Sequence, residues 1–281
     1  MSVRIVTDST SDMPPQLAQQ LGVAVVPLSV IFGEDVYKEN TQITPDLFYD
    51  KLQKAKDLPS TSAPSVGDFL ETYREVLKET DEIISIHLSS KLSATYNNAC
   101  QAAAVLADEG ARIDVIDSQS VSVGMTFLAA AASKAAAAGA SPDEVRKLVD
   151  GMIPRLHIYV LLDTLEFVRR GGRIGRARAF IGTMLRVKPI LSIREGEVHP
   201  EERVRTRAHA LDRLFQLSTA FPNIESIGVA YSTNAIEAEE MQKRLQDALG
   251  GKDVSMARLG PVIGVHAGPG VLGVGILEGE Q

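Results

Sequence analysis

The chain contains 281 residues, 44% of them hydrophobic and 23% charged, so it can bury a large core in one large domain or two smaller ones. Its net charge of −7 argues against a nucleic-acid-binding protein, because such a protein needs a basic face. The single cysteine, Cys100, excludes a disulfide framework or a Cys-based zinc site within one chain. We expect a cytoplasmic protein without a signal peptide or a membrane span.

The first half of the chain alternates strand-like and helix-like patterns. In chain order, the patterns predict a strand over 3–7, a helix over 14–21, a strand over 23–30, a turn at 33–35, helices that begin after caps at Thr44 and Ser65, a strand that ends at Leu88, a helix from Ser93, a strand over 112–116, a helix over 121–138 and a helix opened by Ser141. Such a βα series predicts a mostly parallel sheet. The Ala-rich stretch 125–138 predicts a buried helix.

In the second half of the chain, the predicted strands and helices no longer alternate regularly. The patterns predict strands over 157–162, 188–193 and 197–200, a helix over 205–219, a strand over 227–231, a helix over 234–249, and strands over 254–257 and 271–277. Arg194-Glu195-Gly196 predicts a hairpin between the second and third of these strands. We therefore expect an α/β protein with two closely packed domains, 1–155 with a mostly parallel βα sheet and 156–281 with a mixed sheet and helices.

The segment Ser89 to Thr95 ends an apolar run abruptly in hydroxyl groups. It follows the strand that ends near Leu88, and ligands bind at the carboxyl ends of strands in open α/β sheets. We expect Ser93 to cap the following helix and, with the free N–H groups of its first turn, to bind a small anion. A cap without any ligand is the alternative.

Two further segments and one aspartate could contribute to such a site. Thr61 and Ser62 lie in a Pro-bounded extended loop, and His266 lies in a Gly-rich segment that predicts a tight loop. Each of them has a purely structural alternative, as a helix cap or as a buried histidine. Asp8 follows the first strand, and a turn or cap role is as well supported for it as a site role.

Five arginines occur between Arg169 and Arg178, in an otherwise acidic chain. They indicate either a solvated loop with scattered ion pairs or a docking patch for an acidic partner or a phosphate. The run matches neither a Walker A loop nor the dinucleotide fingerprint, and the five histidines show no metal-ligand spacing. The chain also lacks the Gly-x-Ser-x-Gly elbow of a serine hydrolase.

Taken in order, these segments resemble the DegV family of bacterial fatty-acid-binding proteins nearly from end to end. The matching motifs are Thr7-Asp8-Ser9, Thr61-Ser62-Ala63-Pro64-Ser65, Ser89-Ser90-Lys91-Leu92-Ser93-Ala94-Thr95, Ile116-Asp117-Ser118, Ser122-Val123-Gly124, Gly171-Gly172-Arg173-Ile174, Lys188-Pro189-Ile190-Leu191 and His266-Ala267-Gly268-Pro269-Gly270. The chain departs from the family at Ala94 and Met125, where relatives usually or often have glycine. We expect the methyl group of Ala94 to narrow the approach to the ligand or to change a backbone angle.

The resemblance implies that the protein binds a long-chain fatty acid such as palmitate or stearate, with the carboxylate at Thr61, Ser62, Ser93, Ala94 and His266. It further implies that a separate fatty acid kinase phosphorylates the bound acid and that the acyl phosphate enters phospholipid synthesis.

On this view the protein is not itself an enzyme and needs no cofactor or metal. Arg170, Arg173 and Arg205 would face the kinase, and the protein would contact membranes at most transiently. Two alternatives remain open: a serine esterase or acyltransferase that uses Ser93 and His266, and a phosphate-handling protein that uses the arginine run.

Overall fold

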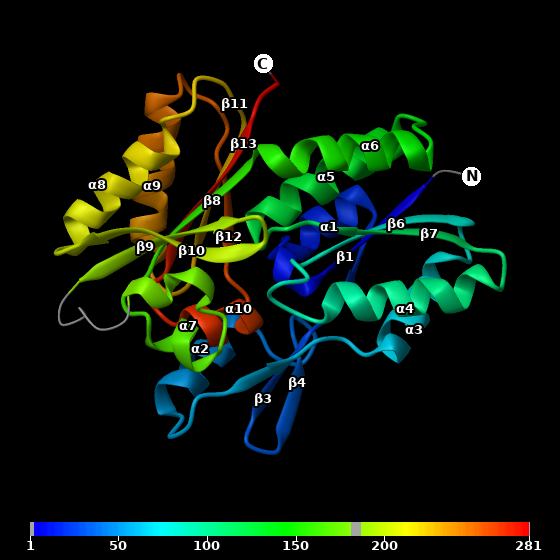
Figure 1. Cartoon of the computed structure of the whole chain (residues 1–281), viewed down its shortest axis with the longest axis horizontal. Coiled ribbons are helices and arrows are strands. Elements are labelled where there is room, and N and C mark those ends of the chain that lie inside the picture. Colours follow the sequence, from blue (N-terminus) through cyan, green and yellow to red (C-terminus); the bar gives the residue numbers. More distant parts are fainter. Residues whose placement is uncertain (1–2, 181–186, 281) are drawn as a thin grey trace.

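The computed structural model describes residues 3–180 and 187–280 and confirms the α/β class (Figure 1). A four-stranded sheet of order β2-β1-β6-β7 is parallel throughout. Its strands are β1 (Arg4–Asp8), β2 (Val23–Val26), β6 (Glu82–His87) and β7 (Arg112–Asp117), and the helices around it are α1 (Pro15–Leu21), α3 (Val66–Val76), α4 (Thr95–Ala107), α5 (Val123–Ala137) and α6 (Pro142–Met152).

Alternation along the strands distributes these helices over both faces of the parallel sheet. Val6 and Ile83 pack on α3 and α4, whereas Ile5 and Ile84 pack on α5 and α6. Both faces are therefore covered, as parallel sheets require. The helix predicted over 121–138 is α5, and it is buried as expected.

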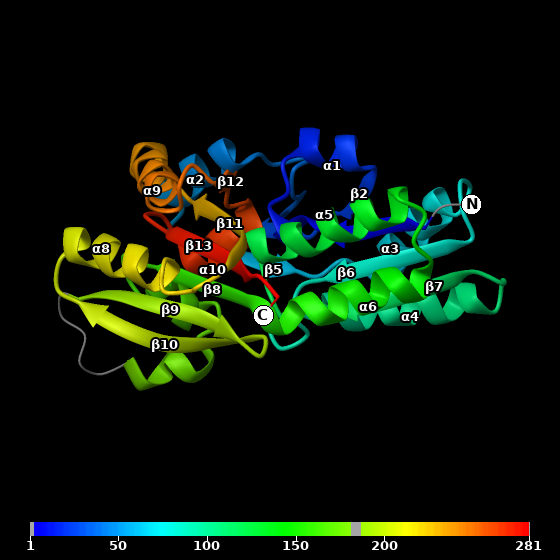
Figure 2. The ribbon, with the colours of Figure 1, turned by 90° about the horizontal axis from the view of Figure 1, so that it is seen from above.

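The second sheet is mixed, with order β10-β9-β8-β13-β11-β12. Its elements are β8 (Leu156–Leu161), α7 (Glu166–Arg170), β9 (Lys188–Arg194), β10 (Glu197–Val204), α8 (Arg207–Ser218), β11 (Ile224–Tyr231), α9 (Ala235–Ala248), β12 (Ser255–Arg258) and β13 (Leu272–Glu278). Helices α8 and α9 cover one face, at the end of the molecule away from α4 and α6 (Figure 2). On the other face, Val123 at the start of α5 packs against Ile158 and Ala230, so the two halves share a core.

A small antiparallel sheet, β4-β3-β5, was not predicted. Its strands are β3 (Ser29–Phe32), β4 (Asp35–Lys38) and β5 (Ser60–Ser62), and α2 (Pro45–Lys54) accompanies them. The continuous strand expected over 23–30 is wrong, because Pro27, which has no N–H to donate, lies in the gap between β2 and β3.

This small sheet joins the two halves of the chain. Phe48 and Tyr49 of α2 pack against Val262 and Val265 of α10 (Pro261–Ala267). The domain boundary expected after residue 155 falls just before β8 and stays a prediction.

The local signals at helix ends were mostly accurate. Thr44, Ser65 and Ser141 each cap a helix through their side chains, and the hairpin turn at Glu195 and Gly196 has the expected positive φ values of 49° and 77°. The expectation that Ser93 is a helix cap is wrong by one position. Ala94 is the cap residue of α4, and the Ser93 hydroxyl instead accepts a 3.3 Å hydrogen bond from the Thr95 amide.

The tight loop expected around His266 is also wrong. His266 lies in the last turn of α10, which ends at Gly268 with a φ of 81°. Gly264 lies inside this short helix, and only Gly268, Pro269 and Gly270 follow its end, so the glycines and proline of the segment mark a helix C-terminus and not a continuous turn.

Candidate ligand-binding cavity

A cavity of about 480 Å³, here called the central cavity, lies among the ends of the parallel strands, the uncovered face of the mixed sheet and α10. Most of its lining is aliphatic, from β8, β9, β11, β13, α10 and the adjoining loops. The polar side chains in the lining are Thr10, Thr61, Ser62, Ser93, Asn98, Ser122, Arg173 and His266. A mostly apolar cavity with a few polar groups is the usual form of a small-molecule site.

Thr61 and His266 meet across 205 residues of sequence. Strand β5 places Thr61 beside β3, and the Thr61 hydroxyl lies 2.8 Å from Nε2 of His266. Burial, with a smaller contribution from the Arg173 guanidinium, lowers the pKa of His266 to about 4. The imidazole is therefore neutral at pH 7, and it presents hydrogen-bonding groups to the cavity without a positive charge.

The other ring nitrogen of His266 faces the backbone of Gly171. Nδ1 is buried and has no hydrogen-bond partner within the described part of the chain. A Cβ atom on residue 171 would lie 2.3 Å from Nδ1. Glycine is thus required at 171 by this close approach.

Ser93 and Ala94 reach the cavity from the turn that precedes α4. The Ser93 hydroxyl lies 2.9 Å from the hydroxyl of Thr95, and the first amides of α4 follow directly. The Asn98 side chain donates a 2.8 Å hydrogen bond to the Pro64 carbonyl, which ties α4 to the segment that carries Thr61. The three predicted polar segments therefore converge on one cavity.

Ser62 is placed differently from Thr61. It lies in the cavity lining, but its side chain is exposed and its hydroxyl donates a 3.1 Å hydrogen bond to the Ala63 carbonyl.

The three predicted docking arginines are not equivalent. Arg173 lines the cavity, and its guanidinium donates to the carbonyls of Leu92 at 3.2 Å and Gly171 at 2.7 Å. Arg170 and Arg205 are exposed and absent from the lining, and Arg170 pairs with Glu166 at 3.3 Å. Arg173 thus connects the cavity to the surface, while the other two lie on the surface alone.

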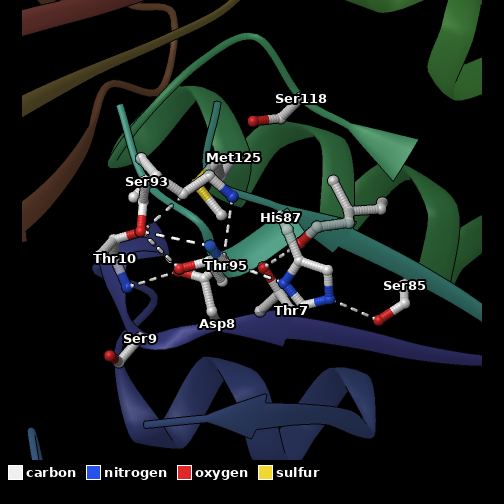
Figure 3. A network of polar contacts seen from close by, with 12 residues as sticks. Thr7, Asp8, Ser9, Thr10, Ser85, His87, Ser93, Thr95, Ser118 and Met125 are labelled. Carbon is white, nitrogen blue, oxygen red and sulfur yellow. Dashed lines mark hydrogen bonds and ion pairs between the residues drawn. The ribbon is translucent and has the colours of Figure 1, made fainter. Parts of the chain in front are cut away.

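Asp8, at the end of β1, is hydrogen-bonded to residues at the end of β6 and just after it (Figure 3). One carboxylate oxygen accepts from the amide and the hydroxyl of Thr10, at 3.0 and 2.5 Å. The other accepts from the Leu88 amide and contacts Nδ1 of His87, both at 3.0 Å. Asp8 caps the turn that contains Thr10, which confirms its predicted cap role. It does not line the cavity, although its partners Thr10 and Leu88 do, and a site role for Asp8 stays a prediction.

His87 and Ser85 were missed by the sequence analysis. Nε2 of His87 lies 2.6 Å from the Ser85 hydroxyl, which makes a Ser-His-Asp chain with Asp8 (Figure 3). Each of the three residues is 0% exposed, and none of them lines the central cavity, so a substrate has no access to Ser85. Two polar residues at alternate positions of an apolar strand were the available signal.

Within residues 3–180 and 187–280, no three His, Cys, Asp or Glu side chains are grouped so that they could hold a metal ion. None of the helices in that part of the chain is long and apolar enough to cross a bilayer.

The chain is similar to known proteins over its whole length. A family model described as "Uncharacterised protein, DegV family COG1307" matches residues 2–279. A DegV domain-containing protein of Halalkalibacterium halodurans is 37% identical over 276 residues, which cover 97% of each chain.

Solved structures of DegV family proteins are also similar to this chain over nearly its whole length. A DegV family protein from Thermus thermophilus, described by its fatty acid binding, is 33% identical with a TM-score of 0.90, and the match covers 99% of this chain and 100% of that one. A stearic-acid-binding protein from Eubacterium ventriosum is 27% identical with a TM-score of 0.91 over 98% of both chains.

Proposed function

The chain belongs to the DegV family, and on that premise we propose that it binds one long-chain fatty acid, such as palmitate or stearate, in the central cavity. The carboxylate would lie at Thr61, Ser62, Ser93, Ala94 and His266, all of which line this cavity. The observation that carries the proposal is the combination of a largely aliphatic lining with a cluster of uncharged hydrogen-bonding groups.

An aliphatic tail accounts for the affinity. Burial of about 14 methylene groups at roughly 0.8 kcal/mol each contributes about 11 kcal/mol before the cost of association. The polar groups then need only to orient the head group. Because His266 is neutral at pH 7, the carboxylate would be held by hydroxyl groups and helix amides and not by an ion pair with the imidazole.

Loose retention of the carboxylate suits transfer to a partner. In our proposal a carboxylate oxygen attacks the γ-phosphorus of ATP on a separate fatty acid kinase in the cytoplasm. A bond forms between that oxygen and phosphorus, ADP leaves, and the acyl phosphate feeds phospholipid synthesis. Arg173 at the cavity, with Arg170 and Arg205 on the surface, would face the kinase or its phosphates.

Two observations weigh against the serine-hydrolase alternative. Nε2 of His266 lies within hydrogen-bond distance of Thr61, and no described carboxylate contacts Nδ1 to orient the ring. The Ser93 hydroxyl lies 2.9 Å from the Thr95 hydroxyl, and among the described residues no histidine or carboxylate is hydrogen-bonded to it to activate it as a nucleophile.

Solvent extraction of the denatured protein followed by mass spectrometry tests the proposal. We expect a stoichiometric acid of about 14 to 18 carbons, as the tail estimate assumes. An empty cavity together with turnover of a generic ester, abolished in Ser93→Ala and retained in Ser90→Ala, would establish the hydrolase instead. Ser90 is a suitable control because its hydroxyl bonds to Asp117 and it does not line the cavity. Nucleotide hydrolysis by the chain alone would favour the phosphate-handling alternative.

A further inference from the structure

Helix α10 begins on two carboxylates from the opposite half of the chain. The Gly260 amide donates a 2.8 Å hydrogen bond to Oδ1 of Asp12, and the Val262 amide donates a 2.7 Å hydrogen bond to Oε1 of Glu39. No side chain of its own caps α10. The first N–H groups of a helix need acceptors, and here Asp12 and Glu39 supply them.

These two bonds bear directly on the central cavity. Four residues of α10 line it: Val262, Ile263, His266 and Ala267. The second oxygen of Asp12 accepts a 2.5 Å hydrogen bond from Ser122, which lines the cavity from the start of α5. One carboxylate therefore fixes two walls of the cavity relative to each other.

The two carboxylates are buried at a cost. Asp12 is 7% exposed and Glu39 is 1% exposed, and neither forms an ion pair with a basic side chain in the described part of the chain. Oε2 of Glu39 is buried without a hydrogen-bond partner there, as is the Tyr49 hydroxyl. Burial raises the pKa of both acids, that of Glu39 to about 7. Buried acids at this cost are unusual where only packing is required.

We propose that Asp12 and Glu39 are positioning residues for the fatty acid site. By accepting the first amides of α10, they hold His266 within hydrogen-bond distance of Thr61 and keep the apolar residues of α10 closed over the ligand. This inference rests on the proposed function for its ligand, but the placement of His266 can be tested without any ligand.

The experiment compares Glu39→Ala with Glu39→Gln, which keeps an acceptor oxygen for the Val262 amide. We expect Glu39→Ala to increase the dissociation rate of a fluorescent fatty acid about tenfold or more, and Glu39→Gln to stay within about threefold of the unaltered protein. Asp12→Ala and Asp12→Asn should behave in the same way. Glu144→Ala is the matched control, because it removes an acid from the N-terminus of α6, away from the cavity.

The second readout is the imidazole of His266, followed by NMR titration of the delipidated protein. Release of α10 exposes the ring, so its pKa should rise from about 4 toward the ordinary value in Glu39→Ala and remain low in Glu39→Gln. A general loss of stability alone would leave the pKa of His266 in the folded protein unchanged. If Glu39→Ala fails to fold, Glu39→Asp, whose oxygens lie one methylene short of the Val262 amide, carries the same expectation.

Two results would overturn the positioning role. One is a folded Glu39→Ala protein with an unchanged dissociation rate and an unchanged His266 titration. The other is Glu39→Gln as defective as Glu39→Ala, because the lost charge and not the lost acceptor would then be responsible. If the unaltered protein binds no fatty acid while His266 still responds as expected, the proposed function fails and the positioning of α10 stands.

Discussion

The substitution Thr61→Val isolates the hydroxyl group that lies closest to His266. Valine is nearly isosteric with threonine and suits strand β5 equally well, so the backbone pairing of Thr61 with Val30 should persist. The variant loses the 2.8 Å contact with His266 and the donor that we assign to the carboxylate. A hydrogen bond to a charged group contributes about 1.5–3 kcal/mol, which corresponds to a roughly 10- to 150-fold weaker affinity.

Displacement of a fluorescent fatty acid from delipidated protein measures this loss. Thr72→Val is the control, since Thr72 is also half-buried and its hydroxyl donates only to the Asp68 carbonyl within α3. A fatty alcohol of equal length should show a smaller difference between the two variants, because it carries no charge for Thr61 to meet. Equal affinity of both variants for the acid would refute the assignment of Thr61 to the head group.

Three further predictions follow from the same site. Arg173→Ala should slow acyl-phosphate formation with a kinase while extraction still yields bound lipid; an empty cavity would show that our division of roles is wrong. The His266 signal should titrate near pH 4 in the free protein and at higher pH with bound fatty acid, and an unchanged titration on loading would contradict the head-group site. Because the pKa of His266 is lower in the folded than in the unfolded protein, the stability that the neutral imidazole contributes should be lost as the pH falls from about 6.5 to about 4. Gly171→Ala should lower both the melting temperature and the fatty acid affinity, because its Cβ would meet the His266 ring. The control Gly151→Ala in α6, where nothing lies within 4 Å of the added Cβ, should raise the free energy of unfolding by up to about 1 kcal/mol. Equal effects of the two substitutions would refute the close contact between residue 171 and His266.

Features that depend on neighbouring residues were predicted well. The caps at Thr44, Ser65 and Ser141 were found because a cap and its partner lie within three residues of each other. The hairpin at Glu195 was found because two consecutive residues must adopt positive φ there. The family was recognised in the same way, from short motifs in a fixed order.

Errors arose where the rest of the fold overruled a local pattern. Pro27 divides a run that has the periodicity of one strand, and the second part joins a separate sheet beside β5. His266 lies in a short helix, α10, and the amides at the start of that helix donate to two carboxylates from distant parts of the chain. The break at Pro27 lies within the run 23–30 itself, but the strand beside which β3 pairs and the acceptors at the start of α10 lie far outside a window of ten residues.

By itself, the sequence determined the α/β class, the order of most elements of the two larger sheets and the three polar segments that contribute to the cavity. Only the tertiary structure decided that Thr61 lies beside His266, that Asp8 and His87 are sealed from the cavity, and that Asp12 supports α10. The physical reason is the distance along the sequence over which each kind of interaction acts. Capping, turn formation and hydrophobic periodicity act within one or two helical turns, whereas burial and hydrogen bonding between distant residues exist only once the chain has folded back on itself.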